Sequence, residues 1–179
     1  MLDPKIIGPL GPGGFDDKYC PDWPIFLGLD FGWWNNYTGW IQPSPDRERL
    51  VILFAHYQEC RTNEENAQIA LEIHQARGYG PLAGGWGDPS KPEALRAYSQ
   101  IFGAQIRGAS SPVRKGQRII KEWLQASRLT KGQSGLVFSR YCPPRLIQEF
   151  HGYDKHEAGT GPHHGPDGTR YFIIGWTGA

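Results

Sequence analysis

The sequence predicts an α/β domain built on a mixed central sheet with helices on both faces. Three strand patterns come first, at 25–32, 37–42 and 50–58, and only short turns separate them. After them, helical and strand patterns alternate along the chain. A meander followed by alternation indicates a sheet that begins antiparallel and continues with parallel strands. The 179 residues are enough for one such domain with a substantial core.

The first strand is the most apolar segment of the chain. Its short, unbroken run of apolar residues is typical of a strand that is buried on both faces. The polar stretch 43–46 predicts the turn between the second and third strands. A helix follows at Thr62, because Thr62 and Glu65 have the spacing of a capping box. Its predicted apolar stripe consists of Ile69, Ala70, Ile73 and Ala76, and Gly78 and Gly80 end it.

The second half of the domain alternates between the two kinds of element. Ser90 and Glu93 form another predicted capping box, which opens a helix with Leu95, Tyr98 and Phe102 on one face. The other predicted elements are a weak strand at 82–86, a strand at 104–107, a helix at 113–127, a hairpin joining 129 to 136–138 around 131–133, a helix at 145–151 and a last helix that starts near Asp167.

Composition excludes several classes of protein. The chain is 39% hydrophobic and 13% aromatic, which argues against disorder. It has no apolar run long enough for a membrane helix and no signal-peptide pattern at its start. Three widely spaced cysteines indicate reduced thiols rather than a disulfide framework or a zinc site. Residues 1–24, rich in Gly, Pro and Asp, predict a linker or N-terminal arm, and the predicted domain is 25–179.

The net charge of +1 conceals an uneven distribution. Residues 1–87 carry six basic and eleven acidic side chains, a net of −5. Residues 88–150 carry eleven basic and four acidic ones, a net of +7, and residues 151–179 have a net of −1. This pattern suits a protein that gathers acids at one site and contacts a polyanion beside it. A solvated basic face is an equally good explanation of the charge alone.

Three aspartates occupy positions that indicate metal binding. Asp30 lies within the apolar first strand, where an unpaired carboxylate is costly. Asp88 follows a predicted strand, and Asp167 opens the last predicted helix, so the three can meet at one edge of the sheet. Their repulsion would raise their pKa values unless cations offset it. Two Mg²⁺ or Mn²⁺ ions, which prefer oxygen ligands, would do so. Alternatively, Asp88 is a turn residue and Asp167 a helix cap.

Other polar and aromatic side chains allow a functional and a structural interpretation. We expect His164 near the metal ions, orienting a water or a phosphate, and His163 facing solvent; a zinc site at this pair lacks further ligands. Glu59 fits an edge position better than a role near the metal ions. Trp33 and Trp34 could stack on a base, but packing in the core or a lid is the simpler expectation. Arg114, Lys115 and Arg118 could bind DNA phosphates or form a solvated helix face.

Four segments in order resemble the C-terminal nuclease domain of the large terminase subunit of tailed bacteriophages, a domain similar to RNase H and to the RuvC resolvase. The resemblance covers about residues 25–175. One departure is Gly168, where the family commonly has Ala, which weakens helix propensity by about 1 kcal/mol. The segments are 27–32 (LGLDFG), 87–93 (GDPSKPE), 106–120 (IRGASSPVRKGQRII) and 163–171 (HHGPDGTRY), the last similar to the family's His-x-x-Asp-Ala-x-Arg-Tyr.

This resemblance implies an RNase H-like fold and hydrolysis of DNA phosphodiesters with two metal ions. It implies Asp30 and Asp167 around the attacking water, and Asp30 and Asp88 beside the leaving 3′ oxygen. It further implies cutting of concatemeric viral DNA in the cytoplasm of the host at the start and end of packaging. The partners would be double-stranded DNA, the portal, the small terminase subunit and an N-terminal ATPase domain. That ATPase is absent here, since no GxxxxGK[ST] motif occurs.

Two alternatives remain open. A free-standing RuvC-like junction resolvase would use the same acids but would need a dimer and four-way junctions. A non-catalytic DNA-binding or portal-docking module would keep the fold and lose the chemistry. Nicking of plasmid with Mn²⁺ separates the catalytic possibilities from this last one.

Overall fold

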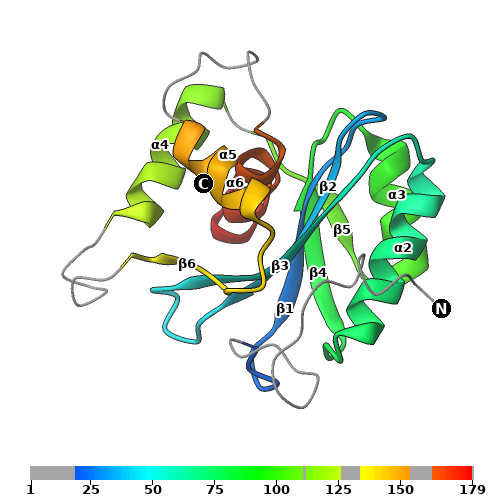
Figure 1. Ribbon diagram of the computed structural model, residues 1–179, viewed down its shortest axis with the longest axis horizontal. Coiled ribbons are helices and arrows are strands. Elements are labelled where there is room, and N and C mark those ends of the chain that lie inside the picture. The colour runs from blue at the N-terminus through cyan, green and yellow to red at the C-terminus, as the bar shows by residue number, and fades with distance from the viewer. Residues whose placement is uncertain (1–18, 111, 126–133, 154–162, 179) are drawn as a thin grey trace.

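A six-stranded mixed sheet forms the centre of the molecule (Figure 1). The computed structural model describes residues 19–110, 112–125, 134–153 and 163–178. The order of strands across the sheet is β5-β4-β1-β2-β3-β6. The strands are β1 (Ile25–Asp30), β2 (Asn36–Pro43), β3 (Leu50–Gln58), β4 (Leu82–Gly87), β5 (Ile106–Gly108) and β6 (Leu136–Phe138).

The predicted meander and its parallel continuation are confirmed. β1 pairs antiparallel with β2, and β2 antiparallel with β3. β4 pairs parallel with β1, and β5 parallel with β4, as expected for strands joined through helices. The strand at 136–138 is confirmed as β6, which pairs parallel with β3, with Leu50 opposite Leu136. Residues 126–133, which would have formed the other half of the predicted hairpin, lie outside the described part of the chain.

Helices cover both faces of the sheet, as predicted (Figure 1). α2 (Asn63–Ala76) and α3 (Pro92–Phe102) pack on one face over a core that includes Trp40, Phe54 and Tyr98. The opposite face carries a second core, which includes Ile41, Leu146 and Phe172. The helices of that face are α4 (Val113–Leu124), α5 (Pro144–Gly152) and α6 (His164–Thr177).

The two predicted capping boxes have different outcomes. Thr62 and Glu65 do form one at the start of α2, with Thr62 Oγ1 accepting from Glu65 N at 3.2 Å and Glu65 accepting from Thr62 N at 2.8 Å. The box at Ser90 and Glu93 is wrong. α3 begins at Pro92, with Lys91 as N-cap and no side-chain cap bond, because proline suits the first turn and disfavours helix in the residue before it.

Smaller differences concern the ends of elements. Ala76, expected on the apolar stripe of α2, is exposed at the last turn. The predicted strand at 104–107 shifts to Ile106–Gly108. From the predicted arm, residues 19–24 contact the sheet: the Gln42 side chain accepts from Cys20 N at 3.0 Å and donates to Cys20 O and Trp23 O. Within the described ranges, no helix is long and apolar enough to cross a membrane.

Candidate functional site

Asp30 is the last residue of β1, at the carboxyl end of a strand in the middle of the sheet. The expectation of a mid-strand position is therefore wrong by a few residues, since the strand ends before Phe31. The side chain is nonetheless mostly buried, with 16% of it exposed. Its Oδ2 lies 2.7 Å from Nδ1 of His164, which gives the carboxylate one fixed partner.

Asp88 stands beside Asp30 because of the register of two parallel strands. Gly28 of β1 is paired with Trp86 of β4, so the residues two positions later, Asp30 and Asp88, emerge next to one another. Asp88 Oδ1 accepts a hydrogen bond from Ser90 N at 2.8 Å, the geometry of an Asx turn. Asp88 is thus a turn residue and also a neighbour of Asp30; the two interpretations of the sequence are compatible.

Asp167 belongs to the first turn of α6 rather than to its start. The helix begins at His164, three residues earlier than predicted. Asp167 Oδ1 accepts from Tyr153 Oη at 3.1 Å and from Arg170 Nε at 3.2 Å, and the Arg170 side chain is only 6% exposed. Two donors from α6 and from the end of α5 therefore orient this carboxylate.

Glycines allow α6 to approach β1 closely enough to bring these acids together. A Cβ on Gly28 would lie 2.8 Å from the carbonyl oxygen of Gly168. A Cβ on Gly168 would lie 2.4 Å from Cδ1 of Tyr37, whose ring is fully buried. The departure from alanine at position 168 thus has a structural reason, because the Tyr37 ring occupies the space that a methyl group would need.

The pKa of the Asp30 carboxyl is raised, and the charges of Asp88 and Asp167 are among the causes. Burial is the largest cause that raises the pKa of Asp30, the hydrogen bond from His164 opposes it, and the charges of Asp167 and Asp88 raise it further. Mutual repulsion was the predicted cause of raised pKa values; for the pKa of Asp30, desolvation by burial is the larger cause. The charges of Asp88 and Asp167 reach Asp30, as an assembled site requires.

The two neighbouring histidines differ in environment. His164 lies at the site: its hydrogen bond to Asp30 raises the pKa of its imidazole, and 28% of the side chain is exposed. His163 was expected to face solvent, and this is wrong, because it is 7% exposed and its ring packs edge-on against Tyr153 at 5.4 Å between centroids. The start of α6 therefore turns one ring inward and the other toward Asp30.

Each aspartate keeps one oxygen available for a ligand. In the ranges that the structure describes, no donor reaches Oδ1 of Asp30, Oδ2 of Asp88 or Oδ2 of Asp167. Open carboxylate oxygens are the ligands that Mg²⁺ and Mn²⁺ prefer. However, among the described residues no group of three or more His, Cys, Asp or Glu side chains is arranged to hold one metal ion.

A second acidic centre, Glu149 of α5, was missed by the sequence analysis. Its side chain is 4% exposed and accepts from Arg145 Nε at 2.9 Å, Tyr57 Oη at 3.1 Å and Gly165 N at 2.8 Å. The bond to Gly165 N ties α5 to the first turn of α6, beside His164. The only signal in the sequence was an Arg and a Glu four residues apart, a spacing that usually marks an exposed pair on a helix surface.

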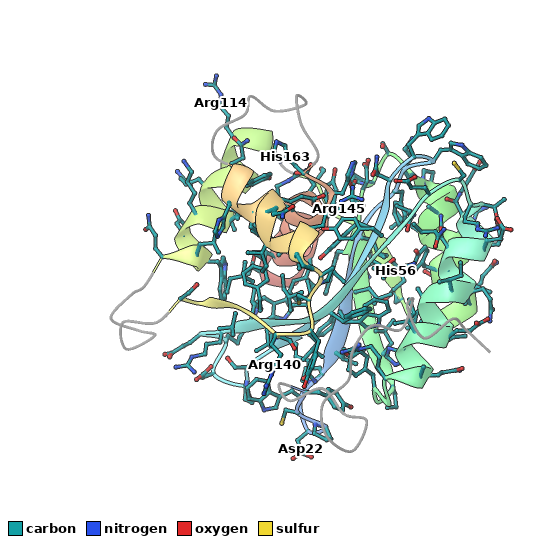
Figure 2. The ribbon with its side chains drawn as sticks, viewed as in Figure 1. Asp22, His56, Arg114, Arg140, Arg145 and His163 are labelled. Atoms are coloured by element: carbon teal, nitrogen blue, oxygen red, sulfur yellow. The ribbon has the colours of Figure 1, made fainter. Side chains whose placement is uncertain are left out.

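The predicted DNA-binding cations lie on α4. Arg114, Lys115 and Arg118 are exposed, and Arg114 points away from the body of the domain (Figure 2). Arg118 forms an ion pair of 3.4 Å with Glu122 in which both side chains are largely exposed. Exposure fits phosphate binding and a solvated face equally well, so their role stays a prediction.

The expectation that Trp33 and Trp34 pack in the core is wrong, whereas packing in a lid and stacking on a base stay predictions. They are 55% and 68% exposed in the connection between β1 and β2. A pocket of about 620 Å³ is lined by Phe31, Gly32 and Trp33 after β1 and by residues of α2, α3 and the loops before these helices. None of the three aspartates lines this pocket, although Phe31 directly follows Asp30. Glu59 is exposed just after β3, in keeping with an edge position.

No protein-family model and no curated protein matches the chain by sequence. Solved structures do match. The nuclease domain of g2p, the large terminase of bacteriophage SPP1, with bound Mn, has a TM-score of 0.58 and 16% identity over 92% of this chain and 94% of that chain. The P22 large terminase nuclease domain has a TM-score of 0.66 and 14% identity over 96% and 92%.

A longer protein matches as well. The large terminase of a thermophilic bacteriophage, solved in complex with ATP-gamma-S, has a TM-score of 0.62 and 15% identity over 87% of this chain. The match covers 41% of that terminase, so this chain spans less than half of its length. The predicted RNase H-like fold class is thereby confirmed: the chain has the fold of large-terminase nuclease domains.

Proposed function

We propose that this chain, which has the fold of phage large-terminase nuclease domains, is a metal-dependent DNA endonuclease domain. The observation that supports the proposal is the placement of three aspartates: Asp30 ends β1, Asp88 follows the paired strand β4, and Asp167 lies in α6, the helix whose His164 contacts Asp30. The carboxylates come from β1, from the residue after β4 and from the first turn of α6, and each keeps an open oxygen. Such a set is suited to hydrolysis of a phosphodiester.

The three aspartates fit divalent cations of the Mg²⁺ or Mn²⁺ type. We infer that Asp30 and Asp167 would hold one ion and that Asp30 and Asp88 would hold another, with water and DNA oxygens completing each shell. Bound ions of this kind supply charge that stabilises the phosphoryl transition state and lowers the pKa of a coordinated water.

Neighbouring side chains orient the three carboxylates, and one of these side chains, His164, can share a proton with Asp30. His164 fixes Oδ2 of Asp30 and so directs Oδ1 outward. Tyr153 and Arg170 fix Oδ1 of Asp167 in the same way. Asp30 and His164 share their hydrogen bond at the site, and burial of Asp30 favours retention of a proton on the pair. The neighbouring Asp88 is held by its turn.

The biological setting is part of the proposal, and the likeness of fold supports it. The full-length large terminase that matches this chain is more than twice as long and is solved with a nucleotide analogue. We propose that this domain works beside an N-terminal ATPase domain in a full-length terminase. Its substrate would be concatemeric double-stranded DNA in the host cytoplasm, cut at the start and end of packaging, with the portal and the small terminase subunit as partners.

Plasmid nicking by the wild-type protein is the primary test. We expect Mn²⁺ or Mg²⁺ to convert supercoiled plasmid to open-circle and linear forms, and EDTA to prevent it, because the aspartates need cations. A linear duplex and a four-way junction should be cut at similar rates. DNA binding without cleavage in either metal would indicate a non-catalytic module, and strong preference for the junction would indicate a resolvase.

Thermal melts with and without Mn²⁺ test whether Asp88 is a ligand. The pKa of Asp30 is raised in the folded protein, so its contribution to stability is present below its unfolded value and is lost as pH rises through the folded value. The raised pKa of His164 acts in the same direction. Mn²⁺ binds the ionised acids and should restore stability near neutral pH, by about 2.7 kcal/mol per site at a hundredfold excess over Kd.

Asp88→Asn should shrink this Mn²⁺-induced rise in melting temperature, because it removes a ligand. Without metal, the variant should melt at or slightly above the wild-type temperature, since a charge that repels Asp30 is gone. Asp22→Asn, which changes an exposed aspartate at the far end of the sheet, is the matched control (Figure 2). Equal Mn²⁺ shifts in wild type and Asp88→Asn would leave Asp88 as a turn residue only.

A further inference from the structure

The guanidinium of Arg145 is held by three contacts beside the acidic site, but some of its N–H groups have no hydrogen-bond acceptor among the described residues. Its Nε donates to Glu149 Oε1 at 2.9 Å, one Nη2 hydrogen donates to Asn35 Oδ1 at 2.7 Å, and its Cζ lies 4.2 Å from the centroid of the Tyr57 ring. Of its five N–H groups, those on Nη1 and one on Nη2 meet no acceptor in the described ranges. The side chain is 37% exposed.

This arrangement differs from an ordinary helix-surface ion pair. In the Arg118–Glu122 pair of α4, the side chains are 72% and 62% exposed. In the Arg145–Glu149 pair the carboxylate is almost fully buried, at 4% exposed, and already accepts from Tyr57 and from Gly165 N. Arg145 donates its Nε to Glu149 and one Nη2 hydrogen to Asn35. Nη1 and the second Nη2 hydrogen therefore remain for a phosphate, which two parallel hydrogen bonds can bind.

Arg145 also lies at the end of the sheet where Asp30 is found. Asn35, which it contacts, immediately precedes β2, and Tyr37 of β2 is paired with Asp30. Glu149, which accepts from Arg145 Nε at 2.9 Å, also accepts from the backbone N of Gly165 at 2.8 Å, and Gly165 directly follows His164. Figure 2 shows Arg145 between α5 and the sheet, whereas Arg140 lies near the opposite end.

We propose that Arg145, held by Glu149 and Asn35, binds a DNA backbone phosphate next to the three aspartates. The ligand class is a phosphodiester oxyanion of duplex DNA, and the inference rests on the proposed nuclease function. An arginine whose side chain is already ordered loses little conformational entropy when it binds, which makes it an efficient anchor for the register of the backbone. Glu149 is a positioning residue in this arrangement, since its carboxylate is buried behind the guanidinium.

A charge-balanced double variant tests the proposal. Arg145→Gln together with Glu149→Gln removes one positive and one negative charge, so the net charge is unchanged and no buried carboxylate is left unpaired. Binding to a duplex in EDTA is measured across a salt series. We expect Kd to rise about tenfold at low salt and the log–log salt slope to fall by about 0.9, the value for one lost phosphate contact.

Arg140→Gln is the matched control, because it removes an exposed positive charge away from the site and should keep the wild-type slope. An unchanged Kd and slope in the double variant would overturn the proposal while nicking by wild type continued. If the wild-type protein neither bound nor nicked DNA, the proposed function itself would be overturned. These two failures are therefore distinguishable.

A second measurement uses only wild-type protein and does not depend on the folding of a variant. Phenylglyoxal modifies arginines, and peptide mapping reports the extent of modification at each position. Bound duplex should slow modification of Arg145 at least fivefold and leave that of Arg140 unchanged. Equal modification of Arg145 with and without DNA would contradict a phosphate contact at this side chain.

Discussion

Asp30→Asn should lower Mn²⁺- or Mg²⁺-dependent cleavage at least about a thousandfold, equivalent to about 4 kcal/mol of transition-state stabilisation. Asp30 is the carboxylate that the two proposed ions share, so its loss affects both. The variant is isosteric and its amide can still hydrogen-bond to His164. Because burial already disfavours the charged form of Asp30, a neutral amide should not destabilise the metal-free fold.

Rates of plasmid nicking, with melting temperatures of the same samples, check this expectation. Asp22→Asn serves again as the control, since it removes an exposed carboxylate far from the sheet edge (Figure 2). Asp30→Asn should still bind DNA in EDTA, because the residues proposed to hold the ions differ from those proposed to contact the DNA phosphates. Nicking by Asp30→Asn within tenfold of the wild-type rate would remove Asp30 from the mechanism.

Gly168→Ala should destabilise the domain by about 1–3 kcal/mol, although alanine is the better helix former by about 1 kcal/mol. The added Cβ would lie 2.4 Å from Cδ1 and 2.5 Å from Cε1 of the buried Tyr37 ring. To relieve the clash between this Cβ and the Tyr37 ring, α6 has to move away from β1. This movement carries Asp167 away from Asp30. We therefore expect a melting temperature lower by about 2–4 °C per kcal/mol and a loss of cleavage of at least tenfold.

Gly152→Ala is the matched control, because a Cβ at Gly152 of α5 would meet no atom of the described residues within 4 Å. It should be neutral or slightly stabilising. In a Tyr37→Leu background the penalty of Gly168→Ala should shrink, since the ring that causes the clash is gone. If Gly168→Ala were as stable and as active as wild type, the Tyr37 ring would be able to shift with little loss of stability, which would contradict this prediction.

The sequence was most informative where local pattern and long-range structure agree. The bounds of the strand at 50–58 and the two residues of the capping box at Thr62 were predicted correctly, because a strand's hydrophobic pattern and helix capping depend on residues close in sequence. Asp30, Asp88 and Asp167 were predicted as a set because strand ends and helix starts gather at one edge of an α/β sheet. His164 was predicted to be near them, and it contacts Asp30.

What the sequence could not supply depends on tertiary contacts. The burial of Glu149 arises from Tyr57 and from Gly165 N, which are distant in the chain from the helix that carries it. The parallel partner of β6 is likewise a strand far away in sequence. The exposure of Trp33 and Trp34 goes against the preference of indole rings for burial, and no local pattern distinguishes it.

The contact between α6 and β1 determines when, during folding, the three aspartates come together. The Asp30–His164 bond joins residues 134 positions apart, and Asp167 reaches the site through the same helix. Contacts of such separation require closure of a very long loop, which is slow compared with the pairing of β1 with β2. A partly folded chain can therefore have its antiparallel strands in place and still lack one of three acids. If the proposed function holds, the acidic site is complete only once α6 has packed against β1.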